Sequence, residues 1–87
     1  MGHSLLFAKS AQRQFDKLPR LAQQRLGEAI ERLANNPLPP GVVKLSGEER
    51  LYRIRVGDYR AVYHLQDERL VILVIKVGHR REVYRDH

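Results

Sequence analysis

The stretch LYRIRVGDYRAVYHLQDERLVILVIKVGHRREVY, residues 51–84, decides the fold of this 87-residue chain. Segments 51–56 and 59–66 alternate in side-chain character, a period of two that is typical of strands with one packed face and one free face. Gly57-Asp58 lies between them and reads as a two-residue turn, with glycine where a positive φ is needed. The stretch therefore predicts two β-hairpins in succession, the first with a tight turn.

The predicted turn fixes which residues pair across the first hairpin. With a two-residue loop, Val56 pairs with Tyr59 and Arg55 pairs with Arg60. One face of the hairpin then carries the predicted core residues Tyr52, Ile54, Val56, Tyr59, Ala61 and Tyr63. The opposite face carries Arg53, Arg55 and Arg60, with His64 nearby.

The basic face of the hairpin has two interpretations. Like charges directly opposite each other on a sheet are unfavourable by about 0.2–1 kcal/mol, so a fold with no use for the Arg55–Arg60 pair is expected to avoid it. An anionic ligand would make the pair favourable. The alternative is a solvated face that keeps a small protein soluble, and the register alone does not separate the two.

Length and composition describe one small basic domain. We assign residues 1–87 to a single domain, near the lower end of what one core stabilises without disulfides or metal. The formal net charge of +6 points to acidic partners, either nucleic acid or an acidic protein. The two halves of the chain are similarly charged, so any basic patch must come from folding.

The sequence argues against disulfides, metal and cofactor sites, and a location in or beyond the membrane. Without cysteine, the chain has no disulfide framework and no thiolate zinc site. Histidines 3, 64, 79 and 87 lack metal-ligand spacing, and no glycine-rich phosphate loop is present, so we expect neither a metal nor a cofactor. No segment has membrane-spanning length or the form of a signal peptide, which predicts a cytoplasmic protein that does not bind membranes.

The N-terminal half reads as a strand followed by two helices. Residues 5–8 form a short apolar run that predicts a strand, and Ser10 is the expected N-cap of a helix that Pro19 ends. A second helix is predicted from about residue 20 to residue 35. Gly27 weakens that helix, which suggests a close approach to the first helix.

The C-terminal half completes a sheet. A Pro- and Gly-rich connector, 37–41, leads to a possible short strand at 43–45. Residues 70–77 are nearly all aliphatic and predict an interior strand that Gly78 ends. The predicted class is α+β: an N-terminal helical hairpin packed on one face of a small, twisted, mainly antiparallel sheet, in the order β-α-α-β-β-β.

The chemistry that these residues favour is binding of a phosphodiester. Guanidinium groups bind phosphate oxygens in a bidentate fashion and stabilise charge that develops on phosphorus. An aromatic ring beside such a cluster can stack on an unpaired base. RNA supplies its own nucleophile, the 2′-hydroxyl, so a protein that aligns the backbone and provides positive charge can cleave RNA without metal.

The order of short motifs resembles the RelE branch of the RelE/ParE toxin superfamily. These motifs are KLSG from Lys44, YRIR at 52–55, YRAVY at 59–63 and VGHRREVY at 77–84, preceded by FAKSA, the KLP break and a second helix ending in NNP. The resemblance spans the whole domain. It implies a small toxin that enters the ribosomal A site and cuts mRNA there, silenced by a helical, RelB-like antitoxin.

The resemblance also implies roles for individual residues. Arg53 and Arg55 would contact the scissile region, where the best-known relatives have lysines. Arg60 and Arg80 would bind the phosphate and stabilise the transition state, and Tyr84 would stack on or orient the base. Further contacts to mRNA or 16S rRNA are assigned to Lys44 and Arg81.

The replacement of lysine by arginine leaves the general base open, because arginine stays protonated. The first candidate is His79, a catalytic residue beside Arg80; His64 and then His87 follow. A surface role is the alternative for each histidine. A further alternative is that positioning and charge stabilisation suffice without a strong base.

Two other functions compete with ribosome-dependent cleavage. A ParE-like toxin would inhibit DNA gyrase without cutting RNA, and would not need the arginines and Tyr84 as a catalytic set. A non-catalytic protein would act through its complex with an antitoxin on operator DNA. Codon-phased cuts in a message would separate cleavage from both.

Overall fold

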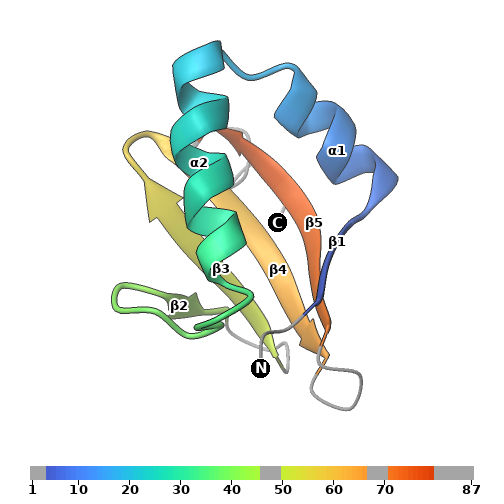
Figure 1. The fold of residues 1–87 in the computed structure, drawn as a ribbon, viewed down its shortest axis with the longest axis vertical. Coiled ribbons are helices and arrows are strands. Elements are labelled where there is room, and N and C mark those ends of the chain that lie inside the picture. The colour runs from blue at the N-terminus through green and yellow to red at the C-terminus, as the bar shows by residue number, and fades with distance from the viewer. Residues whose placement is uncertain (1–3, 46–49, 67–70, 80–87) are drawn as a thin grey trace.

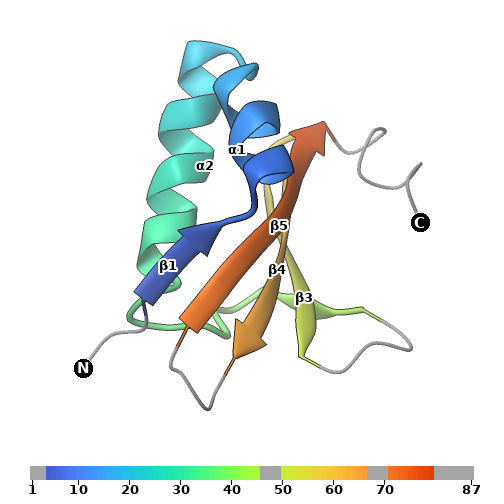
Figure 2. The same cartoon turned by 90° about the vertical axis from the view of Figure 1, so that its right-hand side faces the viewer.

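The computed structural model describes residues 4–45, 50–66 and 71–79 of the chain. Two helices cover one face of a five-stranded sheet, as Figures 1 and 2 show from two directions. The strands are β1 (Ser4–Phe7), β2 (Val43–Lys44), β3 (Leu51–Val56), β4 (Tyr59–Gln66) and β5 (Val71–His79). The helices are α1 (Lys9–Asp16) and α2 (Arg20–Arg32). The predicted α+β class is confirmed.

The sheet has the order β1-β5-β4-β3-β2, and one of its pairs is parallel. β1 runs parallel to β5, with Phe7 beside Val74, whereas the other neighbours are antiparallel. The helical hairpin between β1 and the rest of the sheet allows this parallel pair, because parallel strands need a long crossover. β5 is therefore an interior strand, as its aliphatic composition predicted.

The first hairpin has the predicted register. Val56 pairs with Tyr59 and Arg55 with Arg60, and Gly57 has φ of 60° at the first position of the turn. A glycine with positive φ at that position suits the II′ turn, whose twist matches that of the strands. The short strand β2 pairs with the other end of β3, through Val43 and Arg53.

Both helices differ slightly from their predicted bounds. Ser10 is not the N-cap of α1: Ala8 holds that position, and no side chain caps the helix. α2 ends at Arg32 and not near residue 35, because the next backbone N–H groups, from Leu33 to Asn35, bond three residues back and tighten the chain into turns. Pro19 is the N-cap of α2, so the break between the helices lies where the sequence predicted it.

The two helices approach closely at Gly27, as predicted. A Cβ at this position would lie 3.3 Å from Cζ of Phe15 on α1. The side chain of Gln23 donates hydrogen bonds of 3.0 Å to the carbonyls of Phe15 and Asp16, which satisfies the C-terminal end of α1. Neither of the two described helices is long and apolar enough to cross a membrane.

β5 continues beyond Gly78, which the sequence had marked as its end. It reaches His79, because Gly78 and His79 still pair with Arg60 and Tyr59 of β4. The register shifts once along this pair: Val62 lies beside Lys76 but Tyr63 lies beside Val74. Ile75 is thus an extra residue in β5, a β-bulge that reverses which side chains face the helices.

The helix-side face of the sheet forms the core. Its centre is Tyr63, which is fully buried and stacks on Tyr52 with ring centroids 5.8 Å apart. The Tyr63 hydroxyl donates to the carbonyl of Pro37 and so ties the connector to the sheet. Burial, with a smaller contribution from Tyr52, raises the pKa of Tyr63 and keeps its hydroxyl protonated. The buried members of this core are Ala11, Leu26, Ile30, Leu33, Ile54, Ala61, Tyr63, Leu65, Ile72, Val74 and Val77.

Candidate nucleic-acid interface

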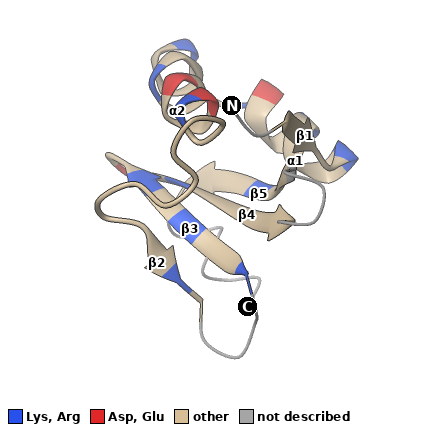
Figure 3. Ribbon diagram, turned by 60° about the horizontal axis from the view of Figure 1, so that its bottom comes forward, with Lys and Arg blue, Asp and Glu red and all other residues tan. Residues whose placement is uncertain are grey.

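The face of the sheet opposite the helices collects cations. We call it the arginine face and define it by the side chains of Arg53, Arg55, Arg60 and Lys76, which the strand pairing places on one side. In Figure 3, bands of Lys and Arg cross the strands, and acidic residues are seen on the helices. Among the described residues, the strands contain no Asp or Glu; their basic residues are Lys44, Arg53, Arg55, Arg60 and Lys76.

The Arg55–Arg60 pair forms the centre of this face. The two residues are direct partners across β3 and β4, so their side chains leave the sheet on the same side. Arg55 is exposed, whereas Arg60 is only 5% exposed. One terminal nitrogen of Arg60, Nη1, donates to the carbonyls of Gly57 at 3.3 Å and Tyr59 at 3.5 Å. The turn therefore holds one guanidinium in place while its partner faces solvent.

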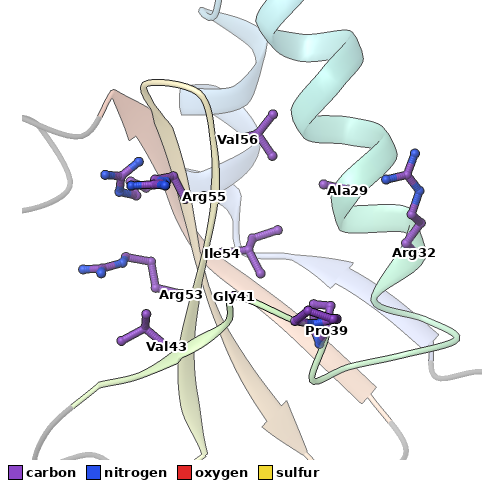
Figure 4. A pocket seen from close by; sticks show the side chains of 11 residues that line it. Ala29, Arg32, Pro39, Gly41, Val43, Arg53, Ile54, Arg55 and Val56 are labelled. Carbon is purple, nitrogen blue, oxygen red and sulfur yellow. The ribbon is translucent and has the colours of Figure 1, made fainter.

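A hollow of about 560 Å³ begins at this face and wraps around the edge of β3. Figure 4 shows Arg53 and Arg55 on one side of the strand, with Ile54 and Val56 on the other. Arg32 of α2 lines the helix side of the same hollow. β2 is only two residues long, so it leaves this part of the edge of β3 open, and the lining is rich in arginine. Such a site suits an anionic ligand.

Lys76 is a basic residue of this face that sequence reasoning missed. It pairs with Val62, which also pairs with Arg53, so the three residues form one row across β5, β4 and β3. Simple alternation from Ile72 and Val74 would have put Lys76 among core residues. The bulge at Ile75 changes that phase, and the aliphatic residues on either side of Lys76 show no alternation from which the bulge could be located.

The same phase change moves His79 away from the arginines. His79 pairs with Tyr59, a residue of the helix side, and the two rings meet edge to face with centroids 5.7 Å apart. The structure therefore does not bring this first candidate base together with Arg55 and Arg60. His64 lies on the arginine face, partly buried, in the row of Leu51 and Leu73.

The remaining predicted site residues are distributed as follows. Lys44 is exposed and pairs with Tyr52, so the register puts it on the side of β3 opposite Arg53. Tyr52, Tyr59 and Tyr63 pack in or against the core, as expected for the helix side. Arg80, Arg81, Tyr84 and His87 lie outside the described residues. Within the described ranges, no group of three or more His, Asp or Glu side chains is placed to hold a metal ion.

Comparison with protein families gives one match that spans nearly the whole chain. Residues 5–84 match the family described as the ParE toxin of the type II toxin-antitoxin system parDE. Toxin RelE3 of Methanocaldococcus jannaschii is 31% identical over 84 residues, which cover 92% of this chain and 93% of the relative. Toxin RelG of Mycobacterium tuberculosis is 29% identical over 86 residues, covering 98% of this chain and 99% of the relative.

Solved structures with this fold include free toxins and their complexes. A free Escherichia coli RelE toxin, with two arginines replaced by alanine, has a TM-score of 0.82 at 30% identity and covers 98% of this chain and 93% of its own. The toxin in the intact Escherichia coli RelBE toxin-antitoxin complex has a TM-score of 0.80 at 29% identity, covering 88% of this chain and 95% of its own. The chain therefore belongs to the ParE/RelE family of type II toxin-antitoxin toxins and is a RelE-like toxin.

Proposed function

We propose that this RelE-like toxin is a metal-independent endoribonuclease that cuts mRNA in the ribosomal A site. The observation that supports it best is the direct pairing of Arg55 with Arg60, with Arg53 on the same face. Like charges directly opposite each other on a sheet repel, and a phosphodiester lying against the pair would offset that repulsion. The RelE toxins among its relatives and structural neighbours place the chain in a family to which such cleavage fits.

The proposed reaction is an attack of the RNA on its own backbone. The 2′-oxygen forms a bond to phosphorus, the bond from phosphorus to the 5′-oxygen breaks, and the 2′-hydroxyl proton is lost while the 5′-oxygen gains one. The products are a 2′,3′-cyclic phosphate, or the 3′-phosphate derived from it, and a free 5′-hydroxyl. Arg53 and Arg55 contact the scissile region. Charge on the phosphate is stabilised by Arg60 and Arg80, and Tyr84 orients the base.

The positions of His79 and His64 make each of them a weaker candidate for the general base. His79 meets Tyr59 on the helix side, and His64 lies four residues along β4 from Arg60, roughly 13 Å away at the rise of a strand. We therefore assign most of the rate enhancement to alignment of the RNA and to charge stabilisation. Replacing either histidine with glutamine is expected to lower the cleavage rate by less than tenfold.

The proposed partners are the mRNA and 16S rRNA of the A site and a cognate helical, RelB-like antitoxin. Support for the antitoxin comes from structural neighbours that were solved as RelB–RelE complexes, including the archaeal one from Pyrococcus horikoshii. Lys44 and Arg81 are proposed as further RNA contacts. Lys44 is exposed at the edge strand β2, where it can reach ribosomal RNA without joining the arginine face.

Primer extension on programmed ribosomes tests the proposal. Wild-type toxin is expected to give cuts in phase with codons, and the Arg55→Gln, Arg60→Gln double variant is expected to be at least about a hundredfold slower. Arg13→Gln, on exposed α1, is the matched control and should cut like the wild type. Uncut mRNA with folded wild-type protein would refute the cleavage proposal.

A second candidate is a ParE-like inhibitor of DNA gyrase, favoured by the family match itself, which is described as a ParE toxin. A gyrase supercoiling assay separates the two functions. Inhibition of supercoiling by the purified toxin, unchanged in the Arg55→Gln, Arg60→Gln variant, would support this alternative. The cleavage proposal expects supercoiling to continue at toxin concentrations that cut mRNA.

A further inference from the structure

We propose that Lys76 binds a backbone phosphate of the RNA, one that flanks the phosphate held by Arg55 and Arg60. This inference rests on the proposed function, because it assigns a further residue to the same RNA-binding face. Lys76 lies on β5 and would thus extend the phosphate-binding surface from the β3–β4 hairpin to a third strand.

The pairing of the strands places Lys76 close to the arginines. Arg60 pairs with Gly78, so Lys76, two residues before Gly78, is a diagonal neighbour of Arg60. Diagonal neighbours in an antiparallel pair have Cα atoms about 7–8 Å apart, within reach of long side chains. Across Val62, Lys76 is two strand spacings from Arg53, roughly 10 Å.

The β-bulge at Ile75 is what gives Lys76 this direction. Bulges often lie beside functional sites, where the extra residue re-aims a neighbouring side chain. A contact from α1 holds the strand after the bulge: the side-chain oxygen of Gln14 accepts a 2.9 Å hydrogen bond from the backbone N–H of Val77. β1 no longer pairs with β5 there, since its last partner is Val74. Without Gln14, this buried N–H would lose that partner.

The charges on this face give a reason for a lysine at this position. Arg55 and Arg60 are direct partners, and Lys76 brings a third cation to the same face of the sheet. An RNA strand carries a phosphate at every nucleotide, so two cation-bearing rows, Arg55–Arg60 and Arg53–Lys76, match a backbone that crosses the strands. A lysine ammonium binds phosphate as a compact point charge with three donors. It does not require the planar two-point geometry by which a guanidinium binds phosphate.

The test is the salt dependence of RNA binding by the purified toxin. The probe is a fluorescent single-stranded RNA of about ten nucleotides with 2′-O-methyl groups, which block attack by the 2′-oxygen. Losing one phosphate contact lowers the slope of log affinity against log salt by about 0.7 for a single strand. Lys76→Gln is expected to weaken binding about fivefold and to lower the slope by this amount, whereas Lys76→Arg keeps both near wild type.

Lys9→Gln supplies the matched control, because Lys9 is exposed on α1 in the helix layer. It should change neither affinity nor slope. An unchanged slope in Lys76→Gln, with wild-type toxin that cuts mRNA, would overturn the role of Lys76 alone. A reduced slope in a toxin that leaves programmed mRNA uncut would support Lys76 and refute cleavage. Wild-type protein with no affinity for the probe would overturn the Lys76 proposal.

Discussion

The two faces of the sheet are built from the same strands but have opposite chemistry. On the helix side, Ile54, Ala61 and Tyr63 are buried against the helices, and the tyrosine hydroxyl has a partner in Pro37. On the arginine face, the alternate residues of the same two strands include Arg53, Arg55 and Arg60, of which Arg55 and Arg60 are direct partners. The first arrangement lowers the free energy of the folded state. The second places two like charges opposite each other, so the stability of the fold and the proposed RNA binding can be tested on separate faces.

The largest expected effect comes from removing a buried side chain from the core on the helix side of the sheet. Leu26→Ala removes a fully buried side chain of α2 and should lower the free energy of unfolding by about 3–4 kcal/mol, since the site collapses only in part. Leu21→Ala is the matched control, because Leu21 on the same helix is 57% exposed. Urea denaturation checks both; equal losses would contradict the core assignment.

A smaller loss is expected from removing a polar anchor of the core, the hydroxyl of Tyr63. Tyr63→Phe leaves the carbonyl of Pro37 without its donor and should cost about 1–3 kcal/mol. Tyr52→Phe removes the same atom from the ring that stacks on Tyr63, and we expect a cost of at most about 0.5 kcal/mol. Thermal unfolding of the two variants would show whether the difference has the expected sign.

Gln14 of α1 bonds to β5 just after the bulge that decides which side chains of β5 face the helices, so it bears on both faces of the sheet. Gln14→Ala leaves the N–H of Val77 without its acceptor and should cost about 1–2 kcal/mol. Gln12→Ala, on the same helix, breaks only an exposed bond to Asp16 and should be nearly neutral. Hydrogen exchange at Val77 provides the local measurement: faster exchange is expected in the Gln14 variant, and unchanged exchange would argue against this contact.

The smallest expected effect has the opposite sign. Arg55→Gln relieves repulsion with Arg60 and should raise the free energy of unfolding by about 0.2–1 kcal/mol while it impairs mRNA cleavage. The gain should shrink as salt is added, because salt screens the exposed charge. Arg13→Gln should leave cleavage unchanged and should not raise the free energy of unfolding, because Arg13 lies in the last turn of α1, where a cation is favourable. A loss of stability in Arg55→Gln would show that this face is structural.

Local rules gave the N-terminal helices and both strands of the first hairpin, but they misjudged the start of α1, the end of α2 and the end of β5. Pro19 acts by restricting φ and Gly57 by permitting a positive φ, and neither effect needs a tertiary contact, so both breaks lie where the sequence placed them. Ser10 as an N-cap failed, since the chain leaves β1 and enters the helix two residues earlier than predicted, with Ala8 as N-cap and Lys9 as the first helical residue. Gly78 failed as a strand end because β4 continues beside it and supplies partners.

The sequence by itself determined the α+β class and the common side of Arg53, Arg55 and Arg60, because a two-residue turn leaves only one register for its hairpin. Only the tertiary structure decided the faces of Lys76 and His79. Their directions depend on one extra residue in β5, which lies at the register shift against β4; Gln14, from a helix distant in sequence, bonds to Val77 just beyond it. The aliphatic residues that make up most of β5 show no alternation of their own, so the phase of the strand is set by its neighbours in space.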